Sequence, residues 1–201
     1  MTTQKIRISV MALAAALALQ ARARDADYRF QLGLSYASGV LRVQDALEAA
    51  IESAQGGWSA QDTFMWPVGL RLSPYLEFSS GLGVGASAGP PVLVIVDNWL
   101  GPDCLSWIVP LGLDVRYTFL RKREISPYVR AGFRYPVAGG DFIDSSTIGG
   151  FGAVGVEFQR QKRISFGLEA AYDSSQVKIK GGAFSRDVRP FQVTISLFAL
   201  F

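Results

Sequence analysis

Hydrophobic and polar residues alternate along eight segments of this chain, which is the pattern of β-strands with two different faces. In the first segment, Tyr28, Phe30 and Leu32 alternate with Arg29 and Gln31. The predicted strands cover residues 28–36, 66–72, 76–86, 109–119, 129–137, 148–158, 164–173 and 191–201. The chain is therefore predicted to be an all-β protein.

The connections between the predicted strands alternate between short and long. Short turns are expected at residues 73–75, 120–126 and 159–163, and long loops at residues 37–65, 87–107, 138–147 and 174–189. An up-and-down barrel shows this alternation, because the short turns gather at one rim and the long loops at the other. The pattern favours a closed antiparallel barrel. The turn at 73–75 would place Arg71 and Glu77 directly opposite each other.

The polar face of these strands consists of Gly, Ser and a balanced set of charges in which every cation is Arg. The set comprises Arg29, Arg71, Glu77, Asp114, Arg116, Arg130, Arg134, Glu157, Glu169 and Asp173. Arginine pairs with carboxylates in confined spaces, whereas a water-facing surface would also carry Lys. We predict that these residues form a salt-bridge network in the lumen, so that the apolar face meets lipid. A gated, narrow polar pore is the alternative interpretation.

Aromatic residues gather near both ends of the apolar face. Those toward the long loops are Tyr36, Trp66, Tyr135, Tyr172 and Phe191, and those toward the short turns are Tyr28, Tyr117, Phe119, Phe158, Phe166 and Phe201. Two such belts are typical of the two membrane–water interfaces. In lipid, only a closed barrel pairs every backbone group of a set of strands. The predicted fold is an eight-stranded antiparallel up-and-down transmembrane β-barrel.

The first residues form a separate segment. Lys5 and Arg7 precede an apolar run from Ile8 to Leu19, and Ala21 and Ala23 supply an A-x-A end. This is the pattern of a secretory signal peptide, and the run is shorter than the ~20 residues that a membrane-spanning helix needs. We predict a cleaved signal peptide at residues 1–23 and a barrel domain at residues 24–201. An uncleaved N-terminal anchor is the alternative.

The first two long loops have patterns of their own. Residues 40–55 place apolar side chains at helical spacing and predict an amphipathic helix that caps the barrel mouth or, alternatively, docks a partner or ligand. In the second loop, Val92, Val94 and Val96 are interpreted as an extension of a hairpin beyond the membrane. Alternatively, these valines line an entrance for small hydrophobic molecules together with Trp99 and Leu100. Cys104 is a lone thiol in this loop and is interpreted as incidental, with an intermolecular disulfide as the alternative.

Two basic runs fall in short turns. They are Arg121-Lys122-Arg123-Glu124 and Arg160-Gln161-Lys162-Arg163. The simplest interpretation is that both are solvated hairpin tips on the periplasmic side. Contact with phosphate or lipid head groups is the alternative.

Composition excludes several functional classes. The 201 residues include one Cys and no His, so the commonest general base and metal ligand is absent, and we expect no metal or cofactor site. The net charge of +3 comes from 20 basic and 17 acidic residues. Three of the cations precede residue 24, which leaves 17 of each sign in the predicted domain. A nucleic-acid-binding domain would keep a basic excess, so we do not expect this protein to bind nucleic acid.

The last strand carries a resemblance to a known family. Its alternating residues Phe191, Val193, Ile195, Leu197 and Phe201 resemble the assembly signal of bacterial outer-membrane barrels. The segments Val109–Phe119 and Ser126–Val137 also resemble hairpins of small OmpA- and OmpW-like barrels. The resemblance implies an outer-membrane location among phospholipids and lipopolysaccharide. It also implies biogenesis through periplasmic chaperones and the barrel-assembly machinery.

The preferred functional hypothesis is a non-enzymatic structural or surface-exposed protein with a filled lumen. Enzymes among outer-membrane barrels resemble one another in using a catalytic His, which this chain lacks. The first alternative is an OmpW-like narrow channel for small hydrophobic or small polar solutes. The second is a secreted soluble ligand carrier. An unknown partner at the long loops is compatible with each of these hypotheses.

Overall fold

The computed structural model describes residues 26–55, 62–97 and 104–201. Eight of its strands form a closed antiparallel barrel, which confirms the predicted fold. These strands are β1 (Ala26–Ala37), β3 (Val68–Phe78), β4 (Leu82–Ala88), β6 (Cys104–Thr118), β7 (Ile125–Gly140), β9 (Gly149–Phe158), β10 (Ser165–Asp173) and β13 (Val193–Leu200). The predicted signal peptide, Trp99 and Leu100 lie outside the described residues.

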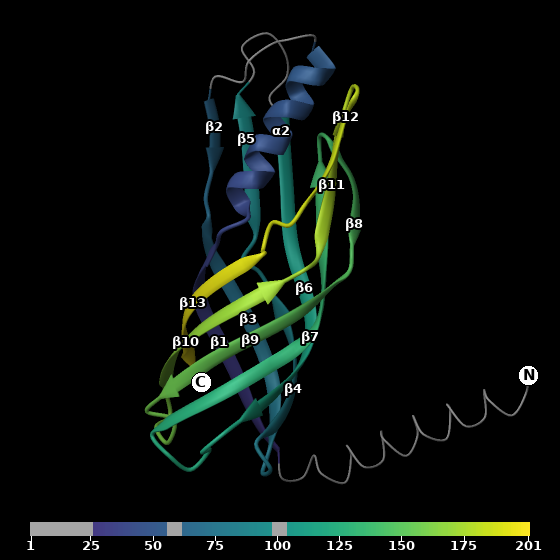
Figure 1. Ribbon diagram of the computed structural model, residues 1–201. Helices are drawn as coiled ribbons and strands as arrows, with labels where there is room; N and C mark the ends of the chain where they lie inside the picture. Colours follow the sequence, from purple (N-terminus) through teal and green to yellow (C-terminus); the bar gives the residue numbers. More distant parts are fainter. Residues whose placement is uncertain (1–25, 56–61, 98–103) are drawn as a thin grey trace, which may run out of the picture.

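Pairing between the first and last strands contributes to barrel closure. Leu34 of β1 lies opposite Leu197 of β13, and β6 pairs with β7 along thirteen residues, from Ser106 opposite Gly140 to Thr118 opposite Tyr128. The strands cross the barrel at a steep tilt, and the short turns lie together at one rim (Figure 1). No helix in the described residues is long and apolar enough to cross a membrane.

The long loops fold into a compact cap above the other rim. The cap contains α2 (Val40–Gln55), β2 (Asp62–Met65), β5 (Val92–Asp97), β8 (Ile143–Thr147), β11 (Gln176–Gly181) and β12 (Phe184–Val188). β2 and β5 extend the sheet from β6, whereas β12, β11 and β8 form a second, three-stranded sheet. In Figure 1, α2 lies between these two groups of strands. The helix predicted at residues 40–55 is therefore present.

One predicted turn is wrong. β3 continues through residues 73–75 to Phe78, and the turn comes instead at residues 79–81, where Gly81 has a φ of 86°. Glycine is favoured there because residues with a Cβ atom rarely adopt a positive φ. Ser73 and Tyr75 are both buried and Pro74 lies opposite Phe30 of β1, so the alternation of the strand continues through the proline. Arg71 and Glu77 consequently lie on the same strand and not opposite each other.

Phe191 is also misplaced by the sequence pattern. It was predicted to start the last strand on the lipid face, but it precedes β13 and only 1% of its surface is exposed. Its ring packs in the apolar core of the cap together with Val40 and Val188. Phe191 has the same odd numbering as the outward-facing residues of β13, which is why the pattern includes it. The chain has already left the barrel wall at this position, so the alternation no longer sets the direction of the side chain.

Glycines inside the barrel face the largest side chains of the neighbouring strands. Gly155 lies opposite Tyr128, and Gly167 lies opposite Phe198. A Cβ atom on Gly155 would be 2.3 Å from Cζ of Tyr128, and one on Gly167 would be 2.3 Å from Cζ of Phe198. The missing side chains therefore let these aromatic rings lie across the neighbouring strand, a known device of β-barrels.

This contact gives a matched test within β9. Gly155→Ala should lower the free energy of unfolding by about 1–3 kcal/mol, because the added methyl group overpacks the ring of Tyr128. Gly152→Ala is the control, since a Cβ atom on Gly152 meets nothing within 4 Å. Equilibrium unfolding in urea measures both variants. Equal stability of the two would contradict the proposed ring-on-glycine packing.

Candidate functional site

The charged residues of the polar face lie mostly inside the barrel. Nine of the ten predicted lumen charges are buried: Arg71, Glu77, Asp114, Arg116, Arg130, Arg134, Glu157, Glu169 and Asp173. The tenth, Arg29, is half-buried near the start of β1. The apolar face lies outside, as the exposed Leu70, Val115 and Leu168 show. The barrel is thus inverted relative to a soluble ligand carrier, whose interior is apolar.

Glu169 of β10 is the central acceptor of the network. Its carboxylate pairs with Arg71 of β3 across the lumen, and its Oε2 lies 2.9 Å from Nη1 of Arg130 on β7. The hydroxyl of Tyr128 donates a hydrogen bond of 2.7 Å to the same oxygen. Arg130 also binds Asp114 of β6 with two nitrogens, at 3.0 and 2.6 Å. One carboxylate therefore connects strands on different sides of the barrel.

A second group of charges lies toward the short turns. Glu157 pairs with Arg116 and Arg160, and Arg160 also pairs with Glu77. The guanidinium carbon of Arg116 lies 3.6 Å from the ring centroid of Tyr128, a cation–π distance. Arg160 belongs to a basic run that was predicted to be solvated. It turns inward instead and pairs there with the buried carboxylates of Glu77 and Glu157.

The third group lies toward the long loops. Arg134 of β7 is 3.6 Å from Asp173 of β10, and its guanidinium carbon is 3.8 Å from the ring centroid of Phe151. Phe151 occupies an inward position that the sequence pattern assigned to polar residues. The aromatic rings of Phe151, Tyr75, Tyr128 and Phe198 thus fill space between the ions.

The complete interior network is electrically neutral. Its buried ions are five cations and five anions: Arg71, Arg116, Arg130, Arg134 and Arg160, with Glu77, Asp114, Glu157, Glu169 and Asp173. Each arginine has a carboxylate partner, and each carboxylate has an arginine partner. The sequence pattern did not predict the burial of Arg160 or of the aromatic rings. Phe151 and Phe198 do fall at inward-facing positions of their strands, and this could have indicated that rings lie in the lumen.

The cap at the long-loop end contains an apolar core in the described residues. The inner face of α2 contributes Val40, Val43, Leu47 and Ile51, and all four are buried. They pack with residues of the surrounding strands and with Phe191, which precedes β13; the strand residues are Val92, Val94, Ile108, Val177, Ile179 and Val188. Val92 and Val94 therefore belong to a packed core and do not line an open entrance. β5 does extend a hairpin beyond the barrel, but the side chains of Val96 and Cys104 lie outside the description.

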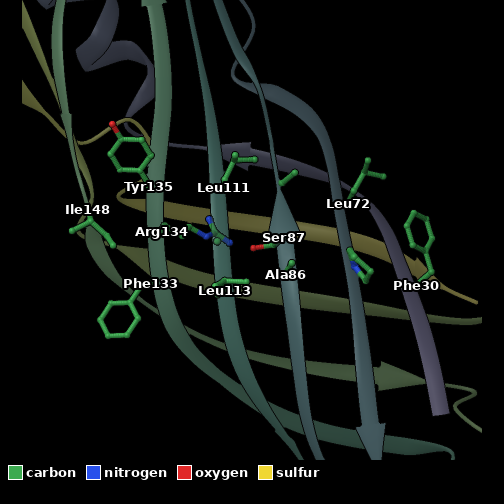
Figure 2. Close-up of a pocket in the computed structure, with 13 residues that line it drawn as sticks. Phe30, Leu72, Ala86, Ser87, Leu111, Leu113, Phe133, Arg134, Tyr135 and Ile148 are labelled. Atoms are coloured by element: carbon green, nitrogen blue, oxygen red, sulfur yellow. The ribbon is translucent and has the colours of Figure 1, made fainter. Parts of the chain in front are cut away.

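The outer wall carries a hollow of about 730 Å³ beside β4 and β6. It forms at the small Ala88, which pairs with Leu72 on one side and Leu111 on the other. Figure 2 shows Leu72, Ala86 and Leu111 in this region. The buried Arg134 contributes to its lining. On the described residues, no group of three or more His, Cys, Asp or Glu side chains is placed to hold a metal ion.

The architecture is that of known outer-membrane barrels. The outer membrane protein OprG from Pseudomonas aeruginosa is 13% identical, aligns over 86% of this chain and 93% of its own, and has a TM-score of 0.52. AlkL is 16% identical over 88% of this chain and 86% of its own, with a TM-score of 0.44. Neisserial surface protein A is 13% identical over 87% and 96%, with a TM-score of 0.43. No protein-family model and no curated protein matches this chain.

The network predicts that neutralising a buried carboxylate lowers the free energy of unfolding much more than neutralising an exposed one. Glu169→Gln should lower the free energy of unfolding by about 3–5 kcal/mol, because Arg71 and Arg130 lose a buried counter-charge. Asp27→Asn removes the partly exposed pair between Asp27 and Arg121 and should cost at most about 1 kcal/mol. Urea titrations of the two variants measure the difference. Similar losses would show that the interior is hydrated and screened.

Proposed function

We propose that this chain is an integral outer-membrane barrel protein with a non-conducting lumen, serving a structural or surface-exposed role without catalysis. The observation that carries the proposal is the interior of paired ions, closed above by the apolar core of the cap. The similarity to solved outer-membrane barrels supports the architecture, and the surface of the barrel supports its placement in lipid.

The outer surface suits acyl chains. Large apolar side chains stand exposed along the strands, including Leu113 at 70% and Phe133 at 67%. Exposed aromatic side chains lie at both ends, with Tyr135 and Tyr172 toward the cap and Tyr117 toward the short turns. A soluble protein with so large an apolar surface would aggregate, whereas a lipid bilayer covers it. This argument supports the membrane protein over the secreted soluble carrier.

The interior favours a scaffold over an axial channel. A solute on the barrel axis would have to separate cross-lumen pairs such as Arg71–Glu169 and then pass the core beneath α2. Separating a buried ion pair is costly, because both charges lose their partners. One observation favours the channel alternative: the hollow beside β4 and β6 offers an apolar surface that reaches the buried Arg134.

The proposal includes export and assembly. We propose that residues 1–23 direct export and that the cap faces the cell exterior, next to lipopolysaccharide. Of the predicted assembly signal, Val193, Ile195, Leu197 and Phe201 are exposed on the outside of the barrel. Periplasmic chaperones and the barrel-assembly machinery would recognise this reduced set, without Phe191.

Two measurements test the proposal. Full-length protein from an envelope fraction should migrate as a compact band before boiling and as an unfolded band afterwards, because a closed barrel resists detergent. Planar bilayers containing the protein should show no reproducible unitary conductance. A steady single-channel conductance would overturn the non-conducting lumen, and solubility without detergent would overturn the membrane placement.

Substitution on the outer face tests the lipid contact directly. Leu113→Arg should destabilise the protein in lipid vesicles by about 2–4 kcal/mol, because a charge would lie near the middle of the bilayer. Leu120→Arg is the control, since Leu120 is 63% exposed but follows β6 in a short turn. Urea unfolding of vesicle-bound protein compares the two. Equal effects would mean that the two leucines face the same solvent.

A further inference from the structure

The two basic runs of the sequence meet at the short-turn rim. The turn after β6 holds Lys122 and Arg123, and the turn after β9 holds Lys162 and Arg163. They are neighbours because β7 and β9 pair, beginning with Ile125 opposite Phe158. The side-chain amide of Gln161 donates a hydrogen bond to the carbonyl of Lys122, and the N–H of Arg160 lies 3.3 Å from the carbonyl oxygen of Glu124. Both turns are therefore held together as one surface.

The structure divides the cations of these runs into two sets. Arg160 points into the barrel toward Glu77 and Glu157, and Arg121 pairs with Asp27 and lies 3.7 Å from Glu77. Lys122, Arg123, Lys162 and Arg163 are exposed, and no described carboxylate lies within 4.0 Å of their nitrogens. We call these four residues the rim cations. Their charges are not used by the fold.

The rim cations lie immediately beyond an apolar belt. Lys122 and Arg123 lie in sequence between the exposed Phe119 and Ile125, and Arg163 is followed directly by the exposed Ile164. In a membrane-embedded barrel, side chains just beyond such a belt lie at the level of the lipid head groups. A cluster of Lys and Arg at that level attracts anionic lipids.

From this placement we propose that the rim cations bind the phosphate groups of anionic phospholipids in the leaflet at the short turns. The proposal rests on the proposed membrane location and adds a ligand class to it. Charge complementarity and the flanking belt both favour this occupant. A soluble polyanion would need no adjacent apolar residues, and Glu124 is the only acid within the two runs.

The other end of the molecule supplies a matched control. Lys178, Lys180, Arg186 and Arg189 carry the same total charge on or beside the β11–β12 hairpin, in the cap. Lys178 lies opposite Asp187, and no large apolar side chain between residues 174 and 192 is exposed. Replacing them removes four cations without touching the short turns.

The experiment uses full-length protein reconstituted in mixtures of phosphatidylcholine and phosphatidylglycerol. Lipids retained after detergent extraction are counted by native mass spectrometry. Wild type should retain phosphatidylglycerol in preference to phosphatidylcholine. The variant K122Q/R123Q/K162Q/R163Q should lose this preference by about tenfold or more, whereas K178Q/K180Q/R186Q/R189Q should keep it. The double variants K122Q/R123Q and K162Q/R163Q should each lose part of it, which provides a test should the quadruple variant fail to fold.

The possible results separate this inference from the proposed function. If every variant enters bilayers and shows the shift on boiling, but the rim variant retains phosphatidylglycerol like wild type, the lipid site is wrong and the membrane location stands. Equal losses in the rim and cap variants would show unspecific attraction and also overturn the site. Binding of soluble cell-wall fragments by the rim cations, without lipid preference, would replace the proposed occupant. Failure of wild type to enter bilayers would overturn the membrane location itself.

Discussion

The pairing of buried charges across the lumen is the interaction on which the rest of this structure depends. Glu169 on β10 binds Arg71 on β3 and Arg130 on β7, so a single carboxylate connects distant parts of the wall. An unpaired ion in this interior would be very costly, and full pairing requires all the strands to be in register. Closure of the barrel and neutrality of its interior are therefore two aspects of one constraint.

Size complementarity lets the charges and the rings share so narrow a space. Gly155 and Gly167 leave room for Tyr128 and Phe198, and Tyr128 in turn supports Arg116 through its ring and Glu169 through its hydroxyl. The aromatic residues thus interact directly with the ions and do more than occupy space in the lumen. This arrangement explains why the inward face is made of glycine, serine, aromatic rings and ions, with few aliphatic side chains.

The two ends of the barrel differ in chemistry. At one end the long loops form a small apolar core around α2, made of uncharged side chains. At the other end, Arg160 and Arg121 are drawn into the ion pairs and the rim cations remain free. The long-loop end therefore presents a packed apolar core, whereas the short-turn end presents exposed cations.

The sequence by itself determined which side of each strand faces inward, because alternation with a period of two is a local property. It likewise indicated the helix at residues 40–55 through local spacing. Only the tertiary structure decided which charges meet: Arg71 pairs with Glu169, far away in the sequence, and not with Glu77. The same holds for Arg160 and Phe191, whose burial depends on cavities that exist only once the barrel has closed and the loops have packed above it.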